Sequence, residues 1–300
     1  MEGPATRAFF VVNPAAGGGR TRRAWPRLRA ALAARGVAFE SAETTGPDSA
    51  ATLTRRAVER GSPLVVAVGG DGTLNEVVNG LADADGNFRA ALGAIPTGRA
   101  RDACRNLALP TDPLAALQRV LDGGETRVDA GAVEWPGGGT RYFINAAGVG
   151  FDAVVARRAA SRRLRGTLPY LLAVAGTIRA HRPVRAILEE DGRVIWSGLM
   201  AAAVAANGAH YGGGMKIAPG ADPADGLLDL VIMGDLGRLE LLRWLPTVYR
   251  GGHLANPKVT TRRARAIVVR AHAALHVDGE AAGNAPVTIS IRPGALRLRR

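Results

Sequence analysis

The chain has 300 residues, enough for two domains that each bury a hydrophobic core. Its formal net charge is +13, supplied almost entirely by arginine, which favours anionic lipid headgroups, nucleic acid or phosphate-bearing substrates as partners. Aromatic residues make up only 5% of the sequence, which excludes the stacking pattern of nucleic-acid readers, so we expect no nucleic-acid partner.

Cys104 is the only cysteine, so no intramolecular disulfide can form. This predicts a reducing, cytoplasmic compartment. We expect Cys104 to pack inside a helix rather than to react. No apolar run approaches the ~20 residues that a membrane-spanning helix needs, so we expect that the chain does not cross a membrane.

An apolar run over residues 8–12 predicts a first buried strand that opens into a glycine-rich loop. Asn13, Pro14 and Gly17 make this loop a candidate phosphate site. It lacks the Gly-Lys-Ser/Thr ending of a Walker A loop, which argues against a P-loop nucleotide hydrolase. From the spacing alone, a plain strand-to-helix turn explains the loop equally well.

Helical composition over residues 21–35 and 48–60 alternates with short strands over 37–42 and from residue 64. This order of strands and helices predicts a parallel sheet with right-handed crossovers and with its loops gathered at one edge. Further along, Asp112 and Pro113 are expected to begin another helix.

Residues 64–76 are the centre of this pattern, with an apolar run, then Gly-Gly-Asp-Gly, then a helical sequence. A buried parallel strand that leads through a glycine turn into a helix is a typical anion site. The backbone N–H groups of this turn can approach a ligand closely at Gly69, Gly70 and Gly72.

Two side chains in this turn refine the prediction. We expect Thr73 to cap the helix. Asp71 would repel a bare phosphate, so its presence predicts a nucleotide that carries Mg²⁺. A tight turn in which Asp71 merely caps the helix is the structural alternative.

The loop at 69–73, followed by Asn75, Glu76 and Asn79, resembles the diacylglycerol kinase catalytic domain family, which includes sphingosine kinases and bacterial lipid kinases. The resemblance extends over nearly the whole chain. It implies an enzyme that uses ATP and Mg²⁺ and transfers the γ-phosphoryl group to a lipid hydroxyl, with Asp71 organising the catalytic Mg²⁺. The nucleotide-binding residues that it implies are Asn13, Pro14, Gly17, Thr45, Gly69, Gly70, Gly72, Thr73, Glu76 and Gly98, to which we add Arg99 as a hypothesis of our own.

The register of the threonine in that set stays open, because Thr44 and Thr45 are adjacent. One departure from the family pattern is clear. Where the family usually has Gly-Thr-x-Asn-Asp, this chain keeps Gly98 and Asp102 but has Arg99 and Arg101 in place of the threonine and the asparagine. We hypothesise that Arg99 replaces the threonine as a phosphate clamp, and that Arg101 points outward or pairs with Asp102.

From residue 126 the chain is rich in strands. Residues 126–145 and 185–196 read as two hairpins around Pro-Gly-Gly-Gly and Asp-Gly turns. We therefore expect an α/β nucleotide-binding domain with a parallel sheet over 1–125 and a mainly antiparallel, β-rich lipid-substrate domain over 126–300. The cleft between two domains commonly holds ligands, so we expect the active site in the cleft between these two domains.

Residues 152–181 are helical in pattern and strongly basic, with Arg157, Arg162, Arg163 and Arg165 among apolar residues. The favoured interpretation is a pair of surface helices that cover the sheet. The alternative is a helix that docks on an anionic membrane, for which residues 238–250 offer a second contact.

A loop with three acids, Asp222, Asp225 and Asp229, could bind a hard cation, although a plain Asp-Gly turn explains the spacing better. The resemblance implies a structural Mg²⁺ here, held by the side chain of Asp225 and by the backbone carbonyls of Asp222 and Leu227.

Residues 275–280 read as a strand that ends in two carboxylates. In a regular strand Asp278 and Glu280 would share one face and could act on a single proton. The resemblance implies that Glu280 is the general base and that Asp278 assists it. The histidines, His276 among them, have no metal-ligand spacing and are assigned no chemistry.

The resemblance implies a lipid kinase for a diacylglycerol-like or related lipid, and with the basic charge of the chain we expect peripheral attachment to an anionic membrane surface, with a homodimer as an option. One alternative is a kinase of a soluble substrate, like NAD kinase or phosphofructokinase. The other is a non-catalytic protein that binds lipid or nucleotide.

Overall fold

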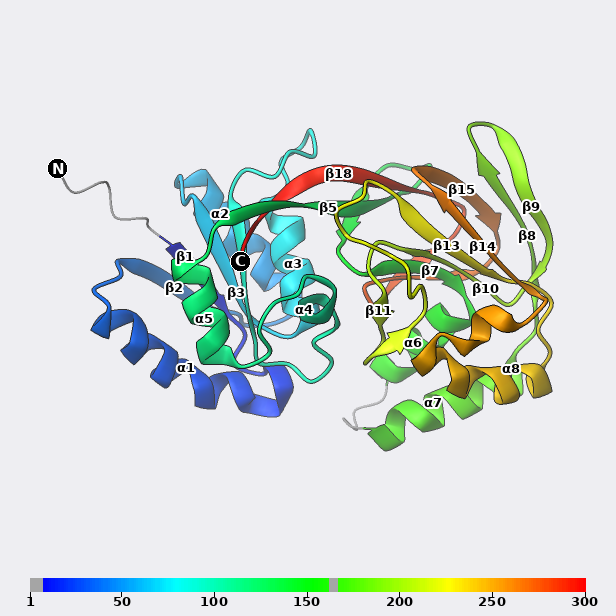
Figure 1. Ribbon diagram of the computed structural model, residues 1–300, viewed down its shortest axis with the longest axis horizontal. Coiled ribbons are helices and arrows are strands. Elements are labelled where there is room, and N and C mark those ends of the chain that lie inside the picture. The colour runs from blue at the N-terminus through cyan, green and yellow to red at the C-terminus, as the bar shows by residue number, and fades with distance from the viewer. Residues whose placement is uncertain (1–7, 162–166) are drawn as a thin grey trace. The chain divides into compact units, whose positions relative to one another are not determined.

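The computed structural model describes residues 8–161 and 167–300, which form two compact units (Figure 1). Unit 1 comprises Met1–Asp129 and Gly294–Arg300, and unit 2 comprises Ala130–Pro293. The sequence pattern assigned all of residues 126–300 to one domain. The difference arises because the last strand is long enough to leave unit 2 and end in the sheet of unit 1.

Unit 1 is an α/β domain. Its strands are β1 (Ala8–Val12), β2 (Phe39–Glu43), β3 (Leu64–Gly69) and β4 (Ala91–Pro96). Its helices are α1 (Ala16–Ala34), α2 (Ser49–Glu59), α3 (Asp71–Leu81), α4 (Asp102–Asn106) and α5 (Pro113–Asp122). The strands pair in the order β2-β1-β3-β4, all parallel, which confirms the predicted sheet.

The inner strands of this sheet are apolar runs, which favour buried parallel strands, whereas the edge strand β2 is mostly polar and has no fully buried residue. β1, β3 and β4 are buried along their whole lengths. α1 and α5 pack on one face through side chains that include Trp25, Leu28 and Leu117. α5 begins as expected, since the Asp112 carboxylate accepts a hydrogen bond from the Ala115 N–H at 2.9 Å.

Unit 2 is a β sandwich with helices on one side. Strands β5 (Glu125–Glu134) and β18 (Val287–Arg299) run from one unit into the other. The other strands are β6 (Thr140–Phe143), β7 (Ala146–Gly150), β8 (Val184–Glu190), β9 (Arg193–Met200), β10 (Ala202–Ala206), β11 (His210–Tyr211), β12 (Met215–Lys216), β13 (Leu228–Met233), β14 (Val259–Ala264), β15 (Ala266–Ala271), β16 (Ala274–Val277) and β17 (Glu280–Asn284). The helices are α6 (Phe151–Ser161), α7 (Thr167–Ala180), α8 (Arg238–Trp244), η1 (Leu245–Arg250) and η2 (Gly252–Ala255).

Two antiparallel sheets enclose the main core of unit 2. One has the order β14-β13-β10-β7-β16-β17, and the other contains β18-β15-β8-β9 together with the β5-β6 hairpin. Their inner faces interdigitate through residues such as Leu188, Val269, Leu230 and Val277. Both predicted hairpins are confirmed, and so is the antiparallel character of the second domain.

The helices of unit 2 cover the outer face of the first sheet. Phe151 and Val155 of α6, Ile178 of α7 and Leu241 of α8 form one cluster with Ala202 of β10. This confirms the favoured interpretation of residues 152–181 as helices that cover a sheet. Within residues 8–161 and 167–300, no helix is both long and apolar enough to cross a membrane.

Candidate functional site

Three loops meet at the carboxyl edge of the sheet in unit 1, where parallel strands place their ligand-binding loops. Thr97 and Gly98 both donate backbone N–H bonds to the carbonyl of Gly69, at 2.8 and 3.1 Å. A Cβ atom on Gly98 would lie 2.5 Å from the Cα of Gly70. The loops after β3 and β4 are therefore in backbone contact, and only glycine fits at position 98.

The loop after β1 is joined to the start of α3. The Asn13 amide donates to the Thr73 hydroxyl at 2.9 Å, and the Asn13 N–H donates to the Val68 carbonyl at 2.9 Å. Pro14 lies in the turn between β1 and α1. Gly17, Gly18 and Gly19 follow with φ of 62°, 72° and 83°, so the regular turns of α1 begin only after them. The structure thus brings the two predicted phosphate loops together.

The start of α3 differs from the prediction in one respect. Thr73 was expected to cap the helix, but Gly70 occupies the N-cap position and Thr73 lies inside the first turn, beside Gly72. Its hydroxyl is instead engaged by Asn13. Asp71 is the first helical residue, and its Oδ2 accepts the backbone N–H of Asp102 at 3.0 Å. That contact fixes the Asp71 carboxylate beside the glycine loops.

The two unusual arginines have different surroundings. Arg99 is exposed, and its Nη2 lies 3.2 Å from the position that a Cβ atom on Gly18 would occupy, so the guanidinium lies against the first glycine loop. Arg101 adopts φ of 58° and its Nε donates to the Gly98 carbonyl at 3.3 Å. The expected pair of Arg101 with Asp102 is not formed, because Arg105, one helical turn along, pairs with Asp102 at 2.7 Å.

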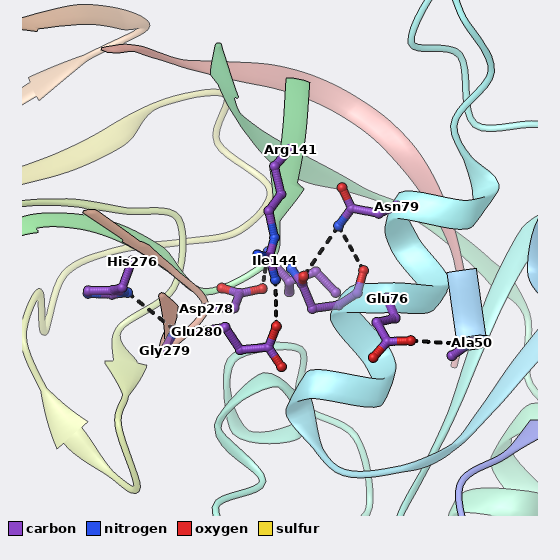
Figure 2. A network of polar contacts seen from close by, with 10 residues as sticks. Ala50, Glu76, Asn79, Arg141, Ile144, His276, Asp278, Gly279 and Glu280 are labelled. Carbon is purple, nitrogen blue, oxygen red and sulfur yellow. Dashed lines mark hydrogen bonds and ion pairs between the residues drawn. The ribbon is translucent and has the colours of Figure 1, made fainter. Parts of the chain in front are cut away.

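Two other predicted nucleotide contacts are engaged within unit 1. Glu76 accepts the backbone N–H of Ala50 at 2.9 Å, which satisfies a donor at the start of α2 (Figure 2). Thr45 is exposed at the same sheet edge, and its N–H donates to the Ser49 hydroxyl at 3.2 Å. Their nucleotide roles stay predictions.

Cys104 behaves as a packing residue. Its side chain is buried in α4. Burial, with a smaller contribution from the Asp71 charge, raises the pKa of the Cys104 thiol to about 12. The thiolate that reaction would need is therefore not formed near neutral pH.

In unit 2, the Asp278-Gly279 pair forms a two-residue turn rather than the end of a strand. Asp278 and Gly279 have φ of 48° and 83°, and Val277 pairs with Glu280 across the turn. This is the geometry of a tight hairpin. The expectation that the two carboxylates share one strand face was wrong, because the chain reverses between them.

Asp278 has a definite task in this turn. Its carboxylate accepts the backbone N–H groups of Ile144, Asn145 and Ala146 at 3.0, 2.9 and 3.1 Å; Figure 2 shows Asp278 beside Ile144. Three such bonds hold the turn against the start of β7. Asp278 therefore positions the segment that presents Glu280.

Glu280 is half-exposed and forms an ion pair with Arg141 of β6, at 2.6 Å between Oε2 and Nη2 (Figure 2). The sequence reasoning missed Arg141, because 139 residues separate the partners. The alternation of polar and apolar residues along β6 does not indicate that Arg141 pairs with Glu280. The guanidinium fixes the direction of the Glu280 carboxylate.

A second network lies beside the turn. His276 accepts the N–H of Gly279 at Nδ1, 3.2 Å away, which leaves Nε2 to donate to the Asp152 carboxylate at 2.9 Å. Tyr211 stacks on the His276 ring with centroids 5.4 Å apart. His276 was assigned no chemistry from its spacing, yet it helps to hold the Asp278-Gly279 turn.

These polar groups form part of the wall of a cavity of about 570 Å³ inside unit 2. Asp152, Tyr211, His276 and Gly279 all line it. Most of the remaining wall is apolar and includes Phe151, Val155, Val204, Met215, Ile217 and Leu241. The cavity thus places a mainly apolar space next to the turn that presents Glu280.

An arginine of β14 lies against the acidic turn at 222–227. The Asp225 carboxylate accepts the Leu227 N–H at 3.0 Å and pairs with Arg263, whose Nε lies 3.7 Å from Asp229. The Asp222 carbonyl accepts the Asp225 N–H at 3.4 Å. Burial raises the pKa of Asp229, opposed by Arg263.

Magnesium prefers an octahedral set of oxygen ligands, several of them water. Within the described residues no cluster of three acidic, histidine or cysteine side chains could hold a metal ion. At this turn, a guanidinium already pairs with the Asp225 carboxylate, so the turn fits an arginine better than Mg²⁺. The resemblance-based assignment of Mg²⁺ to Asp222, Asp225 and Leu227 stays a prediction.

Of the basic residues proposed for membrane contact, Arg162, Arg163 and Arg165 lie outside the described residues. Arg157 is exposed on α6.

Two family models match the chain, the diacylglycerol kinase catalytic domain over residues 7–133 and the YegS C-terminal NAD kinase beta sandwich-like domain over residues 145–300. The diacylglycerol kinase of Mycobacterium tuberculosis strain CDC 1551 is 34% identical over 295 residues, 97% of this chain and 94% of that protein.

Solved structures give the same fold. A diacylglycerol kinase from Bacillus anthracis has a TM-score of 0.78 and 22% identity, covering 99% of this chain and 98% of its own. An NAD kinase from Archaeoglobus fulgidus, solved in complex with ATP, has a TM-score of 0.55 and 15% identity, covering 98% and 93%.

Proposed function

Because this chain belongs to the diacylglycerol kinase catalytic domain family, we propose that it transfers the γ-phosphoryl group of ATP to the hydroxyl of a diacylglycerol-like lipid. Unit 1 would bind the nucleotide, and unit 2 would bind and activate the lipid. Peripheral contact with an anionic membrane surface is part of the proposal, since the acceptor resides there.

The observation that supports a lipid acceptor most strongly is the apolar cavity in unit 2. An acyl chain needs a mainly apolar space, whereas a soluble nucleotide needs hydrogen-bond donors and acceptors along its length. The polar wall contributed by Asp152 and His276 lies where a lipid would present its hydroxyl region, next to the turn of Glu280.

The nucleotide proposal depends on the three loops of unit 1. Their backbone N–H groups at a sheet edge and at the start of α3 suit an anion. The exposed Arg99 guanidinium adds a fixed positive charge beside Gly18. The NAD kinase neighbour in complex with ATP supports ATP as the donor.

Asp71 would hold the catalytic Mg²⁺. A partly exposed carboxylate that a backbone N–H fixes in place, between loops that favour phosphate, fits a magnesium nucleotide. When bound, Mg²⁺ neutralises charge that develops on the phosphates.

The acceptor hydroxyl would lose its proton to Glu280. Arg141 orients that carboxylate, and Asp278 holds the turn that presents it. A positioned carboxylate within reach of a hydroxyl is a competent general base. Asp278 acts through the backbone rather than on the proton.

Two rival functions make different predictions. A kinase of a soluble substrate would phosphorylate NAD, and a non-catalytic binder would turn over nothing. The test is incubation with ATP and Mg²⁺ against a total lipid extract and against NAD, with mass spectrometry of the products. A lipid heavier by one phosphate supports the proposal, and phosphorylated NAD alone or no product contradicts it.

A further inference from the structure

α8 and η1 present large apolar side chains to solvent. Leu239 is 82% exposed, Leu242 is 55% exposed and Tyr249 is 50% exposed. Three arginines lie among them, at positions 238, 243 and 250, and all three are exposed. We call this surface the α8–η1 patch: Arg238, Leu239, Leu242, Arg243, Tyr249 and Arg250.

The patch is unusual because the opposite face of the same segment, α8 and η1, is already buried. Leu241 packs in the cluster of α6 and α7, and Val248 packs in a neighbouring cluster of unit 2. A surface helix of a water-soluble domain normally has one apolar face and one polar face. Here the outer face contains leucines too, so this outer face is suited to an apolar medium.

The charges of the patch favour contact with an anionic lipid surface. Glu240 is the single acid within residues 238–250, and it is paired with Lys258 at 2.8 Å. The Arg243 guanidinium lies over the Trp244 ring, 5.7 Å from its centroid. Leucines flanked by arginines and aromatic rings are typical of helices that lie in the interface of an anionic bilayer.

The patch is continuous with the cavity. Pro246 and Tyr249 are exposed and also line the cavity, and Leu241, Trp244 and Val248 form its wall from the inner side of the same segment. One segment thus borders both the apolar cavity and the surface.

We propose that the α8–η1 patch is the surface with which this protein docks on an anionic lipid bilayer, with Leu239 and Leu242 inserted and the arginines against the headgroups. The cavity wall at Pro246 and Tyr249 then faces the lipid, and an acyl chain enters the cavity there without crossing water. This inference rests on the proposed lipid kinase function for its purpose, though the docking itself is measurable without turnover.

The experiment is co-sedimentation of the full chain with vesicles of phosphatidylcholine that contain phosphatidylglycerol, and with vesicles of phosphatidylcholine alone. The double variant L239S/L242S should lower the partition coefficient for anionic vesicles at least ~10-fold, because two large side chains no longer leave water. The matched control is V194S/L199S, which alters two exposed apolar residues of β9 in the same unit.

A second pair of variants separates the patch from the general charge of the molecule. R238Q/R243Q should weaken binding roughly fivefold for each arginine. R185Q/R193Q removes the same charge from exposed positions on β8 and β9 and should change binding little. This pair also decides the matter if the leucine variant fails to fold, as judged from circular dichroism.

Equal losses in the patch and control variants would overturn the docking surface in favour of diffuse attraction by the net charge. Unchanged vesicle binding in L239S/L242S, or a change of oligomeric state in place of a change in binding, would also overturn it. Turnover with a water-soluble short-chain diacylglycerol should stay within about twofold in L239S/L242S, since neither leucine touches substrate. Absence of turnover in the unmodified protein would contradict the proposed function, while the vesicle comparison would still decide the docking surface.

Discussion

The clearest test of the nucleotide site is the substitution Arg99→Ala. The guanidinium of Arg99, at the position where the family usually has a neutral threonine, lies against the glycine loop of residues 17–19. We hypothesise that it clamps a phosphate of the bound nucleotide. Removing it leaves the backbone donors of the loops intact, so the substitution isolates one charged contact.

The expected magnitude follows from the chemistry of that contact. A hydrogen bond to a charged group contributes ~1.5–3 kcal/mol, which corresponds to about 10- to 150-fold in affinity. Because Arg99 is exposed, solvent screens its charge, and we expect a loss nearer the lower end, about 10-fold. The loss should shrink further as ionic strength rises.

The assay is isothermal titration calorimetry with ATP and with ADP in the presence of Mg²⁺. Arg101→Ala is the matched control, because Arg101 lies in the same loop but donates to the Gly98 carbonyl. It should change affinity by less than about threefold, well below one charged contact. Unchanged affinity in Arg99→Ala, or equal losses in both variants, would refute the clamp.

Three further predictions concern other contacts. Arg141→Gln should lower kcat by about 10- to 100-fold with little change in the KM for ATP, because Glu280 loses its orientation, and Arg141→Lys should restore part of the rate; a normal kcat would contradict this. Between pH 9 and about 12 unfolding releases the Cys104 proton, so stability should fall by ~1.4 kcal/mol per pH unit relative to Cys104→Ala, measured by urea denaturation; parallel pH profiles would contradict it. Chelation by EDTA should leave the Tm unchanged, because Arg263 already pairs with Asp225, whereas Arg263→Gln should gain stability from added Mg²⁺; a Tm that drops on chelation would show that the turn binds a cation.

The structural features that could be predicted from the sequence alone are each specified by residues close together in the chain. Val65, Val66 and Val68 with the glycines after them specify a strand, a turn and a helix within a few residues. The parallel order of strands then brings the loops of residues 13 and 98 to the same edge without further information. The sheet, the hairpins and the meeting of the phosphate loops were predictable for this reason.

The contacts that were missed join residues far apart in the chain. Arg141 of β6 and Glu280 of β17 lie in different sheets, and Asp152 of α6 and His276 of β16 lie in a helix and a strand, so both pairs meet only through the tertiary packing of unit 2. The spacing of Asp278 predicted a shared strand face, whereas the left-handed backbone at that residue reverses the chain. A pattern within a few residues does not show which distant elements pack against one another, so such pairs cannot be predicted from it.

The expected site at the junction of the two domains stays a prediction, as do the choice of Thr45 over Thr44 and the option of a homodimer. Each unit nevertheless has a distinct chemistry of its own. Unit 1 gathers donors for an anion, and unit 2 combines an apolar cavity with an oriented carboxylate.

The central claim is that Glu280 takes the proton of a lipid hydroxyl, and the most direct measurement is the kcat of Glu280→Gln with diacylglycerol as acceptor. The substitution keeps the size of the side chain but removes its basicity. We predict that kcat falls by roughly 10²-fold or more while ATP affinity is retained, the size expected for a general base. A kcat near that of the unmodified protein, or a loss of ATP binding in place of a loss of rate, would contradict the account.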